Sequence, residues 1–422
     1  MRTEAAYAIP SLGLNSAKQQ LFCLFERIKA GNFSLVDETG KKFQFGSHQM
    51  MPQAQLMVRH EAWYKRILSH GSLGLGDSYV DGWWEVGNQK IVDLLGVALL
   101  NDLRGMVDSS LALKFRLAAS RFLNSPTSLK NAAHCVSYHY DLNNAFFKKM
   151  LGSSMTYSCG LRLAPEESLS KMQSNKHQLC AEKLKLADGG KLLDIGCGWG
   201  GFLFYIASNF PGVQAHGITL SRHQFEYVRN KIDQLRLKDR ISVELLDYRK
   251  AQGKYDFVVS IGMFEHVGLS SYQAFMKILK NCLKKNGIGL LHTIGEISDL
   301  DEPEDTWIST RIFPGARLPR LDEISYLMRR NGLNIAHVEN LRPHYADTLR
   351  CWRENVSLRK KEISGLHTGF DRRFFRFWDY YLQSTEAGFR YGTMQLYQVL
   401  FSHGSDWPFP MRLNYPIGAT ST

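Results

Sequence analysis

The clearest evidence for the fold class is the stretch Leu193-Asp194-Ile195-Gly196-Cys197-Gly198-Trp199-Gly200-Gly201. Its first residues end a short apolar strand, expected at residues 191–195, and its glycines lead into the helix that follows. Glycine lets the backbone turn sharply and approach a ligand closely, and ligands bind where parallel strands end. The stretch therefore predicts a ligand site at the carboxyl edge of a parallel sheet. A tight turn that binds nothing is the alternative.

Further apolar runs follow this stretch, with helical segments such as 224–235 and 271–284 between them. Strands are expected at 213–218, 241–245, 255–261 and 288–294, with two weaker ones at 334–339 and 394–401. Strands that alternate with helices indicate an α/β fold with a parallel, doubly wound sheet. Residues 298–319 and 347–390 are expected to cover the ligand edge of this sheet as a helical lid.

The first third of the chain has a different pattern. An amphipathic helix is expected at 17–29, a hairpin at 33–45, a glycine-rich turn with an aromatic patch at 71–84 and helical periodicity at 91–122. Ser125-Pro126-Thr127-Ser128 is the best candidate linker. We therefore expect a smaller, mostly helical accessory domain over residues 1–130, serving lipid docking or dimer contact, and a catalytic domain over residues 131–422.

Composition narrows the class of protein. The chain has 422 residues, of which 44% are apolar and 22% charged, as in globular proteins. No apolar run reaches the roughly 18 residues that span a bilayer, and no signal-peptide pattern is visible, so a cytoplasmic protein is expected. Seven cysteines without metal-ligand spacing fit a reducing compartment and predict no metal site. The net charge of +12 favours an anionic partner: nucleic acid, an acidic small molecule or an anionic membrane surface.

The residues around the glycines favour S-adenosylmethionine over a dinucleotide. Asp194 precedes the first glycine by two positions, which suits a cofactor with a sulfonium and an ammonium group rather than a pyrophosphate. The second strand lacks the acidic residue that commonly binds ribose, but Thr219 and Gln224 can supply polar contacts. After the third strand, the carboxylate of Asp247 and the ring of Tyr248 can hold adenine.

Eight motifs occur in a fixed order from residue 71 onward. They are GSLGLGDSYVDGWWEV (71–86), HYDLNNAFF (139–147), YSCG (157–160), LDIGCGWGG (193–201), GITLSRHQ (217–224), GMFEHVG (262–268), LLHTIG (290–295) and HYADTLRCW (344–352). In these motifs the chain resembles bacterial cyclopropane-fatty-acyl-phospholipid synthases, which use S-adenosylmethionine. About the first 60 residues match less clearly.

The resemblance implies two sets of site residues. Cofactor contacts fall on Tyr157, Ser158, Asp194, Gly196, Gly198, Thr219, Gln224, Asp247 and Tyr248. The residues expected to hold a bicarbonate ion in the active site are Cys159, Glu265, His292, the backbone of Ile294 and Tyr345. Some members of the family carry a cysteine in the motif that matches residues 383–390. This chain reads QSTEAGFR there and has no thiol, so a covalent cysteine mechanism at that motif is excluded.

The chemistry of alkene methylation fits these residue types. An alkene is a neutral, weak nucleophile, so it needs close positioning against the methyl group and exclusion of water. Methyl transfer leaves a carbocation, and a caged anion oriented by Glu265 and His292 can take the proton that ring closure releases. Tyr157 and Phe264 are expected to stabilise the cation with their ring faces. His266 is interpreted as structural.

We therefore expect methylene transfer to cis double bonds of unsaturated phospholipid acyl chains. A related fatty-acid methyltransferase that leaves a methyl or methylidene branch is the first alternative. A nucleic-acid methyltransferase is a second, and Gly262-Met263-Phe264-Glu265 stands where its Asn/Asp-Pro-Pro-Tyr motif is expected, so no nucleic acid is predicted. A catalytically dead lipid-binding protein is a third.

The expected partner is the inner face of a membrane with anionic lipid, to which the protein attaches peripherally, and a homodimer is a further expectation. Tyr79, Trp83 and Trp84 are candidates for rings at the membrane interface, or they pack against the catalytic domain. The segment 372–378 combines arginines with aromatic rings, a pattern more typical of a helix packed on a core than of membrane contact.

Overall fold

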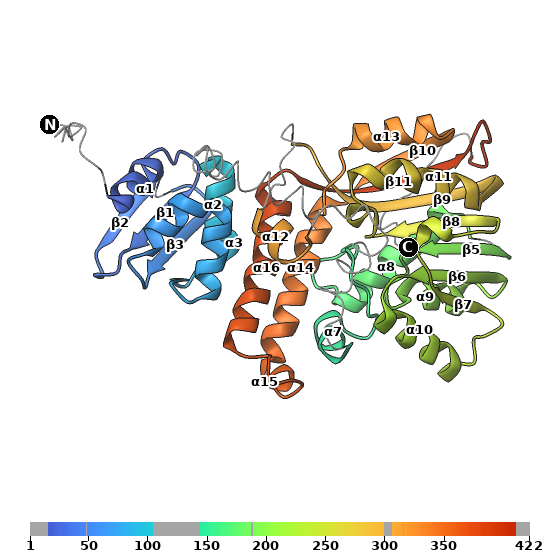
Figure 1. Ribbon diagram of the computed structural model, residues 1–422, viewed down its shortest axis with the longest axis horizontal. Coiled ribbons are helices and arrows are strands. Elements are labelled where there is room, and N and C mark those ends of the chain that lie inside the picture. Colours follow the sequence, from blue (N-terminus) through green and yellow to red (C-terminus); the bar gives the residue numbers. More distant parts are fainter. Residues whose placement is uncertain are drawn as a thin grey trace. The chain divides into compact units, whose positions relative to one another are not determined.

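The computed structural model describes residues 16–47, 49–103, 144–186, 189–298, 306–314 and 316–410. The chain divides into two compact units, Met1–Arg116 and Leu117–Thr422 (Figure 1). The predicted linker at 125–128 and the predicted domain boundary at residue 130 lie outside the described residues, so that boundary stays a prediction.

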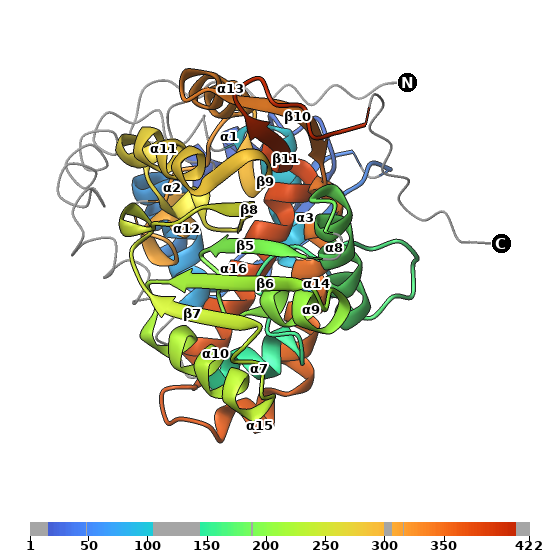
Figure 2. The same ribbon diagram turned by 90° about the vertical axis from the view of Figure 1, so that its right-hand side faces the viewer.

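A seven-stranded sheet forms the second unit, in the order β10-β11-β9-β8-β5-β6-β7, and its strands follow one another down the view of Figure 2. The strands are β5 (Gly190–Ile195), β6 (Val213–Thr219), β7 (Ile241–Leu245), β8 (Tyr255–Ile261), β9 (Leu283–Glu296), β10 (Leu333–Asn340) and β11 (Met394–His403). Neighbouring strands from β9 to β7 pair in parallel, while β11 runs antiparallel to β9 and β10. This Rossmann-like arrangement confirms the predicted α/β class.

Each face of the sheet has its own hydrophobic core, because successive side chains of a strand point to opposite faces. Leu192 and Val259 belong to one core, whereas Leu193 and Val258 belong to the other. Helices α8 (Leu169–Lys183), α9 (Gly201–Asn209) and α10 (Arg222–Gln234) supply the first core. Helices α11 (Tyr272–Cys282) and α13 (Leu321–Arg330) supply the second. The sheet is therefore held rigidly between two helical layers, which fixes the positions of its strand ends.

A helical layer accompanies the sheet. It consists of α7 (Asn144–Leu151), α12 (Thr306–Arg311), α14 (Arg342–Leu358), α15 (Lys360–Ser364) and α16 (Arg372–Tyr391). Figure 1 shows α14 and α16 side by side. Phe375 and Trp378 of α16 are buried, and Trp378 packs on Phe146 with ring centroids 4.8 Å apart. The interpretation of segment 372–378 as a helix packed on a core is therefore confirmed.

The first unit contains a four-stranded sheet as well as helices. Its elements are α1 (Ala17–Phe25), β1 (Asn32–Val36), β2 (Lys42–Gly46), β3 (Gln53–Val58), α2 (Trp63–Val80), β4 (Trp84–Val86) and α3 (Ile91–Leu100). The strand order is β2-β1-β3-β4, and the predicted hairpin is the antiparallel pair β1 and β2. Helices hold more of the described residues than strands do, but the sequence predicted only half of this sheet.

The predicted glycine-rich turn at 71–84 is wrong for most of its length. Residues 63–80 form α2, which is kinked at Gly71 with φ 53° and ψ −133°. Gly74 is required by close packing, since a Cβ there would lie 2.5 Å from the carbonyl oxygen of Arg66. These glycines serve a bent helix rather than a turn.

The aromatic rings of this stretch pack inside the first unit. Trp84 is fully buried and its Nε1 donates to Leu75 O at 3.0 Å, while Tyr79 is buried beside it. Trp83 is half-buried and stacks on His60 with centroids 4.5 Å apart. Tyr79 and Trp84 are thus unavailable as membrane-interface rings, contrary to that expectation. Within the described segments, no helix combines the length and the apolar character needed to cross a bilayer.

Candidate active site

A cavity opens where β5, β6 and β8 end. Of the nine residues predicted to contact the cofactor, eight line it: Tyr157, Ser158, Asp194, Gly196, Gly198, Thr219, Gln224 and Tyr248. They come from the segment before α8, from the end of β5 and the turn after it, from the end of β6, from the first turn of α10 and from η1 (Tyr248–Lys250). The carboxyl edge of the sheet therefore gathers most of the predicted cofactor residues around one space.

The glycine turn shapes the floor of this cavity. Gly196 and Gly198 have φ angles of +81° and +57°, in the left-handed region that side chains disfavour. A Cβ on Gly196 would lie 2.6 Å from Cγ of Met263, whereas a Cβ on Gly198 would meet no atom within 4 Å. Gly198 thus leaves open space next to the cavity, which is the cradle that a closely approaching ligand requires.

Polar side chains close the end of β6. Thr219 donates to Oε1 of Gln224 at 2.7 Å, and Ser221 caps α10 by accepting from the backbone N–H of Gln224. Both Thr219 and Gln224 are buried. Their positions are therefore fixed before any ligand binds.

Of the predicted pair Asp247 and Tyr248, only Tyr248 lies in the wall of the cavity. Tyr248 lines the cavity, and burial raises the pKa of its hydroxyl to about 12. Asp247 does not line it, because its carboxylate accepts from Nε and Nη2 of Arg249 at 2.9 and 2.7 Å. Arg249 itself lines the cavity, and its guanidinium binds the carboxylate that the sequence predicted to hold adenine.

Two residues of α8 also line the cavity, although the sequence reasoning missed them. Lys176 is buried and donates to Oγ of Ser158 at 3.1 Å, and His177 is buried with Nε2 unbonded within the described chain. Burial lowers the pKa of both groups, and for His177 the Lys176 ammonium adds to the effect. The available signal was a run of polar residues, Gln173 to His177, in a helix directly before the glycine turn.

Glu265 lies just after β8 in η2 (Phe264–His266) and is buried. Its Oε2 accepts from the hydroxyl of Thr293 at 2.9 Å, and its Oε1 accepts from the backbone N–H of Ile294 at 3.5 Å. Burial raises the pKa of this carboxyl to about 7, while these two hydrogen bonds favour the ionised form. The group is therefore poised to change its protonation near neutral pH.

His292 lies inside β9, opposite the last residue of β8. Lys183 donates to Oε1 of Gln398 at 2.7 Å, which fixes the orientation of that amide, and Nε2 of Gln398 lies 3.0 Å from Nδ1 of His292. Because an amide nitrogen only donates, Nδ1 of His292 accepts and Nε2 carries the proton. Burial keeps the ring neutral by lowering its pKa. The result is a buried N–H donor at Nε2 with no partner among the described residues.

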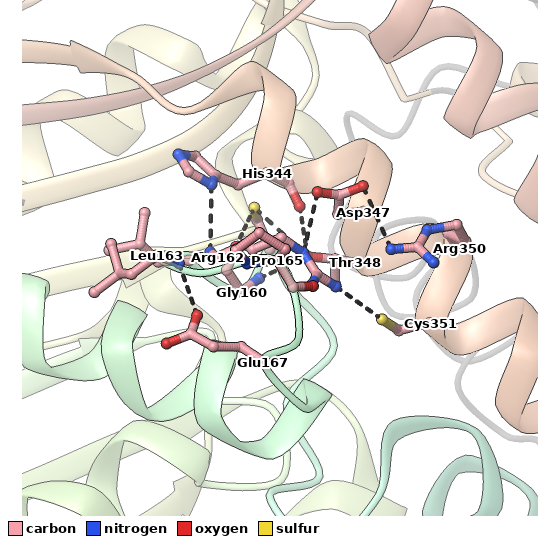
Figure 3. A network of polar contacts seen from close by, with 12 residues as sticks. Gly160, Arg162, Leu163, Pro165, Glu167, His344, Asp347, Thr348, Arg350 and Cys351 are labelled. Carbon is pink, nitrogen blue, oxygen red and sulfur yellow. Dashed lines mark hydrogen bonds and ion pairs between the residues drawn. The ribbon is translucent and has the colours of Figure 1, made fainter. Parts of the chain in front are cut away.

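Cys159 and Tyr345 belong to two segments that are tied together. Gly160 N donates to the hydroxyl of Thr348 at 3.0 Å, and Arg162 forms an ion pair of 3.1 Å with Asp347. Figure 3 shows His344, Asp347, Thr348 and Cys351 along α14, facing the segment that carries Gly160 and Arg162. The contact holds Cys159 against α14, and Tyr345 lies in the first turn of that helix.

The thiol of Cys159 is fully buried, and its Sγ donates to Gly160 O at 3.0 Å. Burial raises its pKa, so the group stays a neutral S–H. The segment that carries Cys159 comes near Glu265 at Gly262, where a Cβ would lie 3.6 Å from Cβ of Ser158 and 3.9 Å from Oε1 of Glu265. The structure thus brings Glu265 and Ile294 into contact, and it places Ser158, the neighbour of Cys159, near Glu265.

Two interpretations around Glu265 are changed. Phe264 lies in the hydrophobic core against Tyr272 and Phe275, with ring centroids 4.3 and 5.0 Å away, and does not line the cavity. It is therefore not placed to stabilise a cation, whereas Tyr157 lines the cavity. His266 lines the cavity too, and burial lowers its pKa to about 4, so a neutral ring faces the ligand space.

Comparison with known proteins finds relatives that match the part of the chain containing the candidate site. The profile of the family described as "Mycolic acid cyclopropane synthetase" matches residues 127–399. The cyclopropane-fatty-acyl-phospholipid synthase of Escherichia coli K12 is 36% identical over 355 residues, covering 83% of this chain and 88% of that protein. A probable fatty acid methyltransferase of Pseudomonas putida is 30% identical over 372 residues, covering 86% and 89%.

A solved structure extends the likeness to the fold. The mycolic acid cyclopropane synthase CmaA1, in complex with SAH and CTAB, superposes with a TM-score of 0.59 at 30% identity. The match covers 64% of this chain and 98% of that chain.

Proposed function

The chain belongs to the mycolic acid cyclopropane synthetase family, and from this premise we propose that it adds a methylene group from S-adenosylmethionine to cis double bonds of unsaturated phospholipid acyl chains. It is a methyltransferase, and the products of the proposed reaction are cyclopropane fatty acids. The observation that carries the proposal is the buried carboxyl of Glu265, with a pKa raised by burial to about 7, close to the cavity of Asp194 and Gly198.

The residues of the cavity fit the proposed methyl donor. Asp194 presents a buried carboxyl whose Oδ1 has no hydrogen-bond partner in the described chain, and Gly198 leaves space for close approach. When bound, S-adenosylmethionine would supply an electrophilic methyl group. The aromatic rings of Tyr157 and Trp199 line the same cavity and exclude water from the reacting alkene.

The second step needs a base, and we propose bicarbonate for that role. Among the predicted residues, His292 offers an oxyanion its Nε2–H, which has no partner in the described chain. Cys159 and Tyr345 would form polar walls, since the thiol of Cys159 already donates to Gly160 O. Glu265 would accept the hydrogen bond of the bicarbonate hydroxyl. The alkene electrons would form the bond to the methyl carbon while the sulfur–methyl bond breaks and leaves its electrons on sulfur. Loss of a proton from that carbon to the bicarbonate would then let the C–H electrons close the ring on the cationic carbon.

The decisive experiment incubates the purified protein with vesicles of a monounsaturated phospholipid and methyl-labelled S-adenosylmethionine. Labelled fatty acids whose NMR spectrum contains the ring methylene protons of a cyclopropane support the proposal. A methylidene branch has the same mass as a ring, so mass analysis alone does not separate the two products. Labelled branched chains without ring protons would instead establish the related fatty-acid methyltransferase, and no labelled lipid would refute both.

The bicarbonate proposal has its own test. Enzyme and buffers freed of carbon dioxide should lose most of their activity, and added bicarbonate should restore it. If activity in demonstrably bicarbonate-free buffer equals the activity after addition, the cage assignment is wrong, although the methyl transfer itself would stand.

A further inference from the structure

A buried ammonium group lies in the wall of the cofactor cavity. Lys176, in the middle of α8, is 1% exposed and lines the cavity with Ser158 and Asp194. Its Nζ donates to Oγ of Ser158 at 3.1 Å, but an ammonium group has three N–H donors. Within the described segments the other two have no acceptor, so they are available to a ligand in the cavity.

Asp194 is the acidic counterpart of this lysine. It is 2% exposed, and its Oδ1 is buried without a hydrogen bond to any described residue. Burial raises its pKa to about 7, while the Lys176 ammonium acts in the opposite direction. One cationic and one acidic group therefore share a cavity, each buried and incompletely bonded. Such groups are costly unless a partner completes their hydrogen bonds.

We propose that Lys176 binds the carboxylate of the methionine part of S-adenosylmethionine, while Asp194 faces its ammonium group. The inference rests on the proposed function, since it takes S-adenosylmethionine as the methyl donor. That end of the donor is a zwitterion, so it brings one charge of each sign to a wall that offers one charge of each sign. Ser158, itself an expected cofactor contact, holds the Nζ of Lys176 in place.

The assignment makes Lys176 a specificity-determining residue. Decarboxylated S-adenosylmethionine has the same adenosine, sulfonium and methyl groups but lacks the carboxylate. With this ligand the Lys176 ammonium stays buried without its counter-charge, and the amine of the ligand remains nearby. A hydrogen bond to a charged group contributes enough free energy for a ratio of about 10- to 100-fold in affinity.

The test is calorimetric titration of the full-length protein with each of the two ligands in the absence of lipid. The wild type should bind S-adenosylmethionine about 10- to 100-fold more tightly than the decarboxylated compound. Lys176→Met keeps the length of the side chain and removes its charge, so it should bind both ligands with nearly equal affinity. Equal affinity of the wild type for the two ligands would overturn the inference without any variant.

Lys171→Met is the control, because Lys171 is another lysine of α8 but is exposed and lies outside the cavity lining. This variant should keep the wild-type affinity ratio. If Lys176→Met also keeps it, or if Lys171→Met loses it equally, the inference is wrong. Failure of the proposed function has a different signature: the wild type would discriminate between the ligands yet form no modified lipid on vesicles.

Discussion

At the scale of single residues, the cavity is defined most sharply by the absence of a side chain at Gly198. This residue has φ +57° and open space where a Cβ would point, on the wall of the cavity. We expect Gly198→Val to abolish S-adenosylmethionine binding, because the valine would fill the space that the ligand needs. Calorimetric titration measures the loss.

Gly404→Val controls for the backbone cost of that change. Gly404 has φ +59° and equally open space, but it lies beyond β11 and outside the cavity. Both variants should lose comparable stability, about 1–3 kcal/mol for a side chain in the left-handed region. Only Gly198→Val should lose the ligand, and unchanged affinity in that variant would remove the cofactor assignment of this turn.

Glu265 predicts the pH dependence of turnover. Burial raises the pKa of its carboxyl to about 7, so the ionised form dominates only above that pH. If the carboxylate orients the base, kcat at saturating substrates should rise as pH increases through about 7 and fall as the group is protonated below it. Glu265→Gln should lower kcat by about 10²–10⁴-fold and remove this limb of the profile. A limb that persists in Glu265→Gln would show that another group titrates there.

Thr293 provides a directional test of the same carboxyl. Its hydroxyl donates to Glu265 Oε2 at 2.9 Å and thereby favours the ionised form. Thr293→Val removes this donor at nearly constant volume, so the pKa of Glu265 should rise and the limb of the kcat profile should move to higher pH. Thr293→Ser retains the hydroxyl and should leave the limb in place. A downward movement in Thr293→Val would contradict the assignment.

At the scale of elements, a hydrogen bond joins α14 to the segment before α8 that carries Gly160. The hydroxyl of Thr348 accepts from the buried N–H of Gly160, for which the described part of the chain shows no second acceptor. Thr348→Val should therefore reduce the free energy of unfolding by about 1–3 kcal/mol, the cost of leaving a buried donor unsatisfied. Urea unfolding measures the change, with Thr348→Ser as the control that keeps the hydroxyl. Equal stability of Thr348→Val and the wild type would show that the contact contributes nothing.

The elements also show how far the sequence alone carries. Strands 241–245 and 255–261 were predicted with the bounds that the structure has, because β-branched and aromatic runs end at clear turn residues there. The start of β9 was predicted too late, because Lys284, Lys285 and Asn286 interrupt the apolar pattern of that strand. The reversed direction of β11 was not predictable, because the long helical insertion before it allows either direction.

The sequence predicted which types of residue form the site better than it predicted the contacts between them. Gly196, Gly198 and Gly201 also satisfy the dinucleotide spacing GxGxxG, so glycines alone do not separate the two cofactors. Lys176 escaped notice because a lysine in a polar helix is normally solvated, and only tertiary packing buries it. The pairing of Asp247 with Arg249 likewise depends on the η1 turn, which no periodicity indicates.

At the scale of the whole molecule, two units share one chain, and the match to the family profile falls within the second of them. CmaA1 matches 64% of this chain with 98% of its own length, and the family profile begins at residue 127. A chain without the first unit is therefore sufficient for the methyltransferase fold. The first unit has a separate sheet and a separate core, so we expect it to serve docking on the membrane or contact between two copies of the chain.

The double bond of the proposed acyl substrate lies within a bilayer, so we expect the protein to dock on the membrane surface and draw a chain into its cavity. With a net charge of +12, its binding to vesicles should strengthen with the fraction of anionic lipid and weaken as salt screens the charges. Vesicle sedimentation over a salt series measures this. A fragment that begins near residue 131 should still bind S-adenosylmethionine but lose most of its activity on vesicles, while its activity on detergent-dispersed phospholipid should remain. If the fragment modifies vesicle lipid as fast as the full chain does, the first unit has no docking role. Contact between two copies of the chain then remains as its expected function. Comparing the oligomeric state of the full chain with that of the fragment in solution tests this alternative.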